Sequence, residues 1–273
     1  MPLLELLPKQ RLNRALDRGL SIAGRMLLAV TLAFLLAPAI IVIILSFSNA
    51  EFIAFPPPTW GMRQYRTLLE SQMWLDAIWL STRLAVPTAI LSALIAVPAA
   101  YAIYRTSLPG RSLLSLFGLL SLIVPISAYA VAMYGLYVLL GLLGTKVGII
   151  LAHTVLAFPL VLIIVTAALS RIPRELELVA MTLGASRLRA WIGITGRLLI
   201  PALVTGFIFA FLASFDEAVF INFLGGPGLV TLPKAIFDSV RFGIDPVITA
   251  IATLLIFASA VVVGIASWLE RRS

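Results

Sequence analysis

Three side chains that could do chemistry lie within otherwise apolar stretches of this sequence. Asp216 and Glu217 are neighbours towards the end of one hydrophobic run, and His153 lies inside another. An ionised carboxylate in hydrocarbon is costly, so such residues normally face a bundle interior, a water-filled path or a partner. Successive residues of a helix point about 100° apart, so the two carboxylates need not share one role. For His153, a role in proton relay or ligand binding competes with a hydrogen bond within the helix bundle.

The elements that must position these residues are hydrophobic helices. Apolar residues make up 61% of the chain and charged residues only 12%, which is typical of proteins that cross a membrane several times. A helix needs roughly 20 apolar residues to span a bilayer. Six stretches are long enough: 26–47, 78–104, 113–143, 147–169, 198–224 and 247–268. They lack the alternation of barrel strands, so we predict an all-α membrane protein with six transmembrane helices.

The distribution of Lys and Arg predicts the orientation of these helices. Fourteen of the 20 basic residues fall in the segments 9–25, 105–111, 171–197 and 271–272. The positive-inside rule places these segments, and therefore both termini, in the cytoplasm. We expect a cytoplasmic amphipathic segment at 1–25 and a six-helix transmembrane domain at 26–270. No small-residue cleavage site follows the first apolar run, so we do not expect a cleaved signal peptide.

The loop at 171–197 is polar and rich in arginine, although it lies between two apolar stretches. Pro173 suits the start of a helix, and Glu175 and Glu177 lie near its positive N-terminal end. The following apolar residues fall at positions i, i+3, i+4 and i+7, which places them in one stripe on the helix. They are Leu176, Val179, Ala180 and Leu183.

The same loop carries signals for a second helix. Gly184 can end the first helix, and Ser186 can cap another one over residues 187–194. The predicted form is therefore a short helix, a glycine break and a second short helix. Two interpretations of the apolar stripe are open: insertion into the groove of a partner protein, or an amphipathic helix lying on lipid headgroups.

The loop resembles the cytoplasmic coupling loop of ABC importer permeases, through which a separate ATPase drives the membrane subunit. In that family the loop runs Glu-Ala-Ala, three residues, Gly, and nine more residues to Ile-x-Leu-Pro. The residues that match are Ala180, Gly184, Ala185, Ser186, Ile194 and, later, Pro201. Four positions depart from the pattern: Leu178 replaces the glutamate, Val179 replaces an alanine, and Gly196-Arg197 replace the Leu-Pro.

The missing glutamate puts a specific salt bridge to the ATPase in doubt, but it leaves the apolar stripe intact. Glu177 is adjacent to Leu178 and is the candidate to replace it, although its side chain points about a quarter-turn away. The coupling set implied by the resemblance comprises Glu175, Leu176, Glu177, Val179, Ala180, Leu183, Gly184, Ala185 and Ser186.

Further motifs look like the spermidine/putrescine branch of this family. They are Phe55-Pro56-Pro57-Pro58, Ala152-His153-Thr154, Ser214-Phe215-Asp216-Glu217, Gly226-Pro227-Gly228, Leu232-Pro233 and Gly243-Ile244-Asp245-Pro246. The resemblance implies a type I importer in a bacterial inner membrane. Its partners would be a second homologous permease, two ATP-binding subunits and an external solute-binding protein. It implies neither a cofactor nor a metal.

For such an importer, Asp216 and Glu217 are the candidate substrate contacts. A polyamine is a strongly hydrated cation, so carboxylates along its path would replace part of the hydration shell. The aromatic faces of Phe215 and Tyr134 would add cation–π contacts. Two alternatives are open for the carboxylates: an ion pair with Lys234 or Arg241 that holds an outer gate, and contact with the second permease.

Other function classes lack their sequence signals. The chain has no G-x-x-x-x-G-K-S/T loop, so ATP hydrolysis is expected on another polypeptide. It also has no H-E-x-x-H motif, no G-x-S-x-G motif and no cysteine, so we do not expect an enzyme. An ion-coupled secondary transporter is the competing hypothesis, but we find no internal repeat of the kind common in those folds. The solute could also be γ-aminobutyrate, an opine or another small amine.

Overall fold

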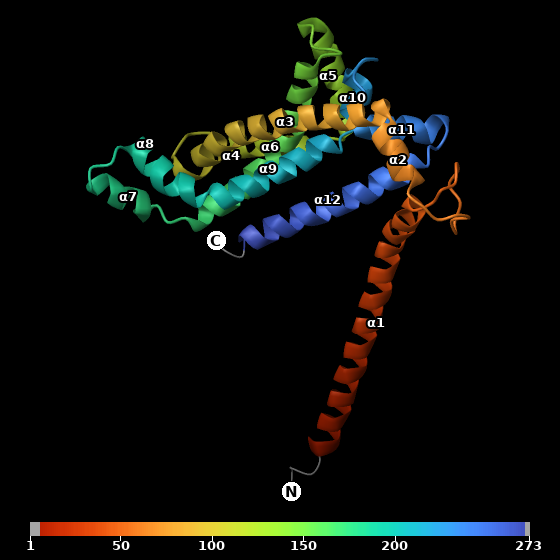
Figure 1. The fold of residues 1–273 in the computed structure, drawn as a ribbon. Helices are drawn as coiled ribbons and strands as arrows, with labels where there is room; N and C mark the ends of the chain where they lie inside the picture. Colours follow the sequence, from red (N-terminus) through yellow and green to blue (C-terminus); the bar gives the residue numbers. More distant parts are fainter. Residues whose placement is uncertain (1–5, 271–273) are drawn as a thin grey trace. The chain divides into compact units, whose positions relative to one another are not determined.

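The computed structural model describes residues 6–270, and the regular elements of these residues are helices (Figure 1). The helices are α1 (Leu6–Ser46), α2 (Arg63–Glu70), α3 (Gln72–Arg105), α4 (Arg111–Leu119), α5 (Ile126–Leu140), α6 (Lys146–Arg171), α7 (Glu175–Thr182), α8 (Arg187–Ala190), α9 (Ile200–Phe215), α10 (Val219–Leu224), α11 (Leu232–Phe242) and α12 (Val247–Glu270). A 3₁₀ turn covers Leu120–Leu122, and a π-helical turn covers Trp191–Gly196. The helical fold class is confirmed.

Four described helical segments are long and apolar enough to cross a membrane. They are Ser21–Ser46, Gln72–Arg105, Lys146–Arg171 and Val247–Gly264. Two helix pairs qualify only when each bent pair counts as one span, which brings the number to as many as six. The pair Arg111–Leu122 and Ile126–Leu140 bends by 104°, and the pair Arg187–Gly196 and Ile200–Phe215 bends by 71°.

Two helix breaks change details of the sequence prediction. The apolar stretch 113–143 is not one straight helix, because Pro125 lacks a backbone N–H and the chain turns there. The stretch 198–224 is also interrupted, since α9 ends at Phe215 and α10 begins at Val219. Asp216 and Glu217 therefore lie in a helix break, and not inside a continuous span as the hydropathy pattern indicated.

The chain divides into two compact units. The first contains the chain up to Thr67 together with Pro246–Ile256. In its connecting loop, Ser48 pairs with Trp60 in an isolated antiparallel bridge, and Gln64 Nε2 donates to the carbonyls of Ser48 and Ala50 at 3.1 and 2.8 Å. Within α1 the helix is continuous from Leu6, while residues 1–5 of the predicted surface segment 1–25 lie outside the described residues.

The second unit, Leu68–Asp245 with the chain from Phe257 onward, contains the loop and the carboxylates singled out above. Its centre is formed by α3, α6 and α9, which pack side by side (Figure 1). Small buried residues allow this close packing: they include Ala89, Ala96, Ala100, Ala157 and Ala210. At Gly206 of α9 a Cβ atom would lie 3.1 Å from the Val161 side chain of α6, so a larger residue would push these helices apart.

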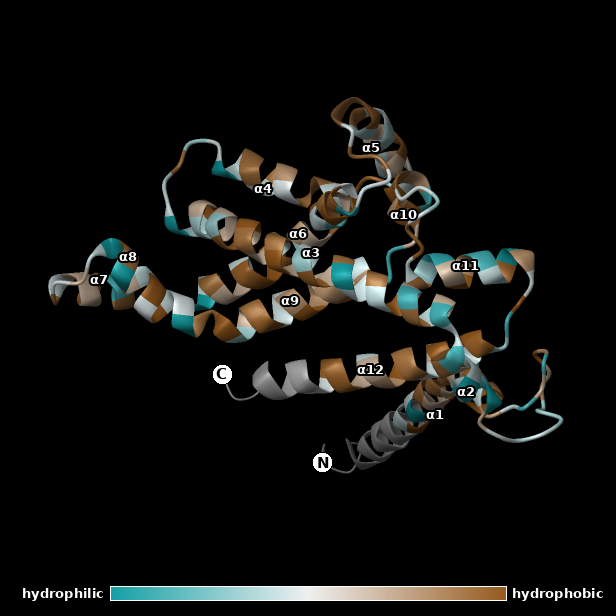
Figure 2. Ribbon diagram, turned by 45° about the horizontal axis from the view of Figure 1, so that its top comes forward, coloured by the Kyte–Doolittle hydropathy of each residue, from teal (hydrophilic) through white to brown (hydrophobic). Residues whose placement is uncertain are grey.

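Hydrophobic residues also continue onto the outer faces of these helices (Figure 2). In a water-soluble protein such faces would be a liability. Around a bundle of this length and composition they are the surface expected to meet lipid.

Candidate functional site

The loop between α6 and α9 has the predicted form of two short helices separated by a glycine. Helix α7 runs Glu175–Thr182, and Gly184 has φ +91°, which is the left-handed conformation that favours glycine. Helix α8 begins after Ser186, whose Oγ accepts the backbone N–H of Arg189 at 3.3 Å. The second helix is shorter in α form than predicted, since Trp191–Gly196 continues it as a π-helical turn.

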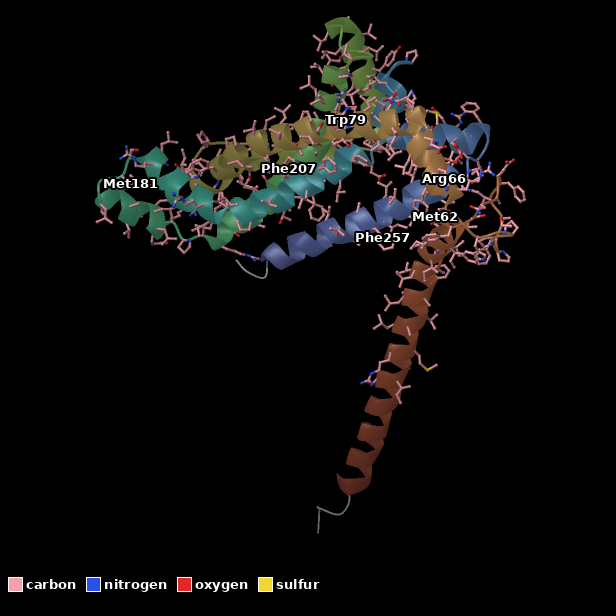
Figure 3. The ribbon with its side chains drawn as sticks, viewed as in Figure 1. Met62, Arg66, Trp79, Met181, Phe207 and Phe257 are labelled. Atoms are coloured by element: carbon pink, nitrogen blue, oxygen red, sulfur yellow. The ribbon has the colours of Figure 1, made fainter. Side chains whose placement is uncertain are left out.

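Large apolar side chains project from this loop. Leu183 is 84% exposed, and the predicted stripe residues Leu176 and Val179 are exposed too, with Ala180 half-buried. The apolar surface is wider than the predicted stripe, because Leu178, Met181 and Leu188 are also exposed (Met181 is labelled in Figure 3). A polar loop with so many exposed apolar residues is typical of an interaction surface.

The two glutamates of α7 occupy different environments. Glu175 is exposed, whereas Glu177 is buried against the rest of the chain. The Glu177 carboxylate accepts a hydrogen bond from Thr195 Oγ1 at 2.5 Å, and Arg105 Nε lies 3.9 Å from it. Glu177 therefore faces the protein and does not offer its carboxylate to a docking partner.

The second candidate site is the break between α9 and α10. The Glu217 side chain is buried there, and its two carboxylate oxygens accept the backbone N–H groups of Val219 and Phe220 at 2.9 and 2.7 Å. These are first-turn donors of α10 that have no partner within the helix. Glu217 therefore caps α10 in the manner of an acidic N-cap.

His153 of α6 lies beside this cap. Its Nδ1 is hydrogen-bonded to Ser214 Oγ at 2.8 Å, and its Nε2 lies 3.8 Å from Glu217 Oε2. The three side chains are buried. The interpretation of His153 as a residue that is hydrogen-bonded within the bundle is confirmed.

The predicted gate pair between a carboxylate and Lys234 or Arg241 is not formed among the described residues. Lys234 Nζ instead donates to the carbonyl of Gly226 at 3.4 Å, and the Arg241 guanidinium lies 5.5 Å from the centroid of the Phe237 ring. In this structure the side chain beside the buried Glu217 carboxylate is that of His153.

Asp216 differs from Glu217 because its side chain is exposed. The neighbouring Phe215 is half-buried and stacks on Phe211 with ring centroids 5.5 Å apart. Tyr134 is 46% exposed on α5, and no hydrogen bond or ring contact of the described residues joins it to Asp216. Of the four predicted path residues, Asp216 presents an accessible carboxylate and Glu217 supports the backbone beside it.

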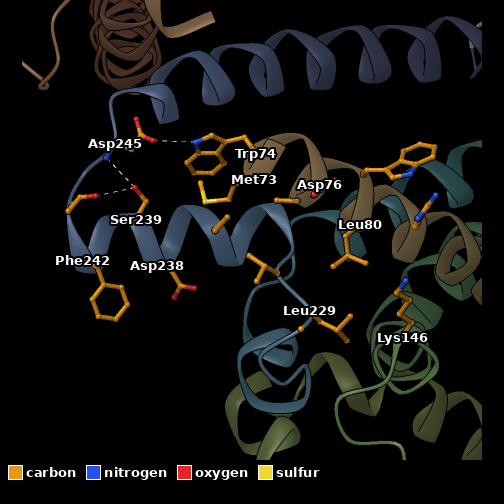
Figure 4. Close-up of a pocket in the computed structure, with 17 residues that line it drawn as sticks. Met73, Trp74, Asp76, Leu80, Lys146, Leu229, Asp238, Ser239, Phe242 and Asp245 are labelled. Carbon is orange, nitrogen blue, oxygen red and sulfur yellow. Dashed lines mark hydrogen bonds between the residues drawn. The ribbon is translucent and has the colours of Figure 1, made fainter. Parts of the chain in front are cut away.

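A cavity of about 840 Å³ between α3 and α11 was not predicted from the sequence (Figure 4). Its wall combines acidic, basic and aromatic side chains: Asp76, Asp238, Asp245, Arg83, Lys146, Trp74, Trp79 and Phe242. Trp74 Nε1 donates to Asp245 Oδ2 at 3.3 Å, and the Arg83 guanidinium lies 4.8 Å from the Trp79 ring centroid. The acidic residues come from α3 and the α11 region, so only the fold brings them together.

Comparison with known proteins places these features in a family context. The family described as "Binding-protein-dependent transport system inner membrane component" matches residues 85–273. The putrescine transport system permease protein PotI of Escherichia coli (strain K12) is 31% identical over 247 residues, covering 88% of each chain. The spermidine/putrescine transport system permease protein PotC of the same strain is 32% identical over 243 residues, covering 88% of this chain and 90% of PotC.

The fold is shared with solved transporter structures. A chain of a bacterial alginate ABC transporter, solved in complex with an alginate pentasaccharide-bound periplasmic protein, superposes with a TM-score of 0.70 at 18% identity. That match covers 95% of this chain and 96% of the other. A chain of an amino acid ABC transporter solved with histidines gives a TM-score of 0.55 at 16% identity, covering 77% of this chain and 98% of the other.

Proposed function

Because this chain belongs to the family of inner membrane components of binding-protein-dependent transport systems, we propose that it is a membrane subunit of an ATP-driven importer of polyamines, with putrescine as the first candidate solute. The observation that carries this proposal is the similarity to putrescine and spermidine/putrescine permeases over 88% of the chain. The exposed carboxylate of Asp216 is suited to contact a cationic solute, which supports the same class of solute.

The energy for transport would come from separate ATP-binding subunits. This chain lacks a phosphate-binding loop of the Walker type. The exposed apolar residues of α7 and the Gly184 turn give a surface suited to insertion into a groove of such a subunit. In this proposal Glu175, Leu176, Val179, Ala180 and Leu183 face the ATPase, Gly184, Ala185 and Ser186 form the turn, and Glu177 holds the loop from the inside.

The transport cycle follows from this docking. Two ATP-binding subunits close on ATP and draw together the coupling loops of this chain and of a second permease. The helix bundle then opens towards an external solute-binding protein, and hydrolysis resets it. The prolines within α3 and α6 suit helices that bend during such a cycle. We place the chain in a bacterial inner membrane with both termini in the cytoplasm, as its basic residues predict.

Uptake of labelled putrescine by cells that carry the complete transporter tests the proposal. Cells lacking this chain should lose uptake, and restoring the chain should recover it. Depleting ATP should stop uptake, whereas collapsing the proton gradient while ATP is maintained should leave uptake unchanged. Uptake that follows the proton gradient would favour an ion-coupled carrier. Uptake that is unchanged by deletion would exclude putrescine and direct the test to γ-aminobutyrate and other small amines.

A further inference from the structure

The coupling loop, residues 171–197, is fastened at its base to α3, a helix that does not adjoin the loop in the sequence. Along the chain the loop joins α6 to α9, yet several of its residues contact the last turns of α3. Arg105 Nη2 donates to the Ile172 carbonyl at 2.6 Å, and Arg174 donates to the carbonyl of Tyr104. Further along, the rings of Trp191 and Tyr101 meet edge to face with centroids 5.5 Å apart.

The charged part of this fastening is buried. The Arg105 side chain is 3% exposed and the Glu177 side chain 12%. Arg105 Nε has no hydrogen-bond partner among the described residues, although Glu177 Oε1 lies only 3.9 Å away. A buried guanidinium N–H without a partner is unfavourable. Thr195 Oγ1, 2.5 Å from the same carboxylate oxygen, ties the far side of the loop to Glu177.

Helix α3 leads from this fastening to the cavity. It is 34 residues long, or about 50 Å at the rise of an α-helix. Along its length it packs on α6 and α9. At its other end Trp74, Trp79 and Arg83 line the cavity, and Ser81 Oγ accepts the backbone N–H of Leu232 at 2.8 Å.

We propose that the buried pair Arg105 and Glu177 is the fastening through which movement of the coupling loop is delivered to α3. This inference rests on the proposed function, because it assumes that an ATPase moves the loop. The two are positioning residues, since they contact neither the solute nor ATP. Their short separation without a hydrogen bond leaves room for the contact to tighten as the loop is pulled. Alternatively, the movement of the loop reaches the helix bundle through α6 and α9, to which the loop is joined along the chain.

The test uses the complete importer in proteoliposomes with ATP and labelled putrescine. Both variants Arg105→Gln and Glu177→Gln remove the charge of the side chain; Glu177→Gln also keeps its size, whereas Arg105→Gln shortens it. We expect each variant to retain ATP hydrolysis and to transport about tenfold less putrescine per ATP, because a buried charge-assisted contact is lost. The double variant should be no worse than either single variant, as expected for residues that act as one pair.

Charge-matched controls come from exposed residues outside the loop. Arg111→Gln and Glu70→Gln remove the same charges at exposed positions and should leave the amount of putrescine per ATP unchanged. Normal transport per ATP in both pair variants would overturn the proposal. Failure of both pair variants to assemble with the ATPase would also overturn it, because the pair would then serve only to fold the loop.

A second measurement separates this proposal from the identity of the solute. The chain has no cysteine, so spin labels can be placed at Gln72→Cys on α3 and Leu139→Cys on α5 in a complex with cysteine-free partners. ATP should change the distance between the labels, and Glu177→Gln should abolish the change. The unaltered complex could fail to transport putrescine while ATP still changes this distance and Glu177→Gln abolishes the change. The assignment of putrescine as the solute would then be wrong, and the role of Arg105 and Glu177 would be supported. A distance change that persists in Glu177→Gln would refute the proposal that Arg105 and Glu177 deliver the movement to α3.

Discussion

Glu217 Oε2 lies 3.8 Å from His153 Nε2 while the same carboxylate caps the first turn of α10. One buried side chain thus connects α6 to the break between α9 and α10. Because Ser214 holds the other nitrogen of His153 at 2.8 Å, three buried polar residues fix the geometry of this break. Asp216, next to it, is thereby presented on a defined backbone.

The cap predicts a stability effect for Glu217→Ala. Removing the carboxylate leaves the backbone N–H groups of Val219 and Phe220 without their acceptors, which should lower the unfolding free energy by about 1–2 kcal/mol. Glu217→Gln keeps one amide oxygen as an acceptor and should lose less. Thermal unfolding of the purified complex in detergent measures both. Equal stability of the alanine variant and the unaltered protein would contradict the capping role.

Asp216 should matter for transport and not for stability. Its carboxylate is exposed, so Asp216→Asn should assemble normally. It should lower putrescine uptake about tenfold, which is the effect of losing roughly 1.4 kcal/mol of interaction with a cation. Asp216→Glu, which keeps the charge, is the matched control and should recover much of the uptake. Full uptake by the asparagine variant would show that the Asp216 carboxylate does not contact the solute along its path.

The loop is the part of the molecule that its sequence predicts best. Helix periodicity, Gly184 and Ser186 are local signals, and the two short helices with their glycine break follow from them. The role of Glu177 could not be predicted in the same way. Its burial depends on Arg105 and Thr195, which lie 72 and 18 positions away in the sequence.

The carboxylate site shows the same limit. Hydropathy places Asp216 and Glu217 in one apolar stretch, but cannot show that α9 ends just before them. The separation of their roles, one exposed and one capping α10, depends on His153 approaching from α6. The cavity beside α3 lacked any local signal, since its acidic residues come together only through tertiary packing.

The apolar surface of the loop predicts how docking can be broken. Leu183 is 84% exposed, so Leu183→Asp should change little of the packing within this chain and should not prevent membrane insertion. A charge placed in a partner's apolar groove should weaken ATPase association and uncouple its stimulation from uptake. Leu183→Met, which stays apolar, is the control. Co-purification of the ATPase and uptake per ATP are the two measurements, and normal values for the aspartate variant would refute docking at this residue.

The backbone conformation of Gly184 predicts that a substitution there affects the same loop through backbone strain. Its φ of +91° disfavours any residue with a side chain, although a Cβ there would meet no atom within 4 Å. Gly184→Ala should therefore destabilise this turn by about 1–2 kcal/mol through backbone strain alone. The strain should redirect α8 relative to α7 and weaken ATPase association.

Gly193 offers the matched control for this prediction. A Cβ at Gly193 also meets nothing within 4 Å, and its φ lies outside the left-handed range. Gly193→Ala should therefore leave ATPase binding intact, since alanine is favoured over glycine in helical segments. The amount of ATPase retained on the purified membrane subunits compares the two variants directly. Equal retention would show that the conformation at Gly184 is not what shapes the docking surface, and a selective loss in Gly184→Ala would show that it is.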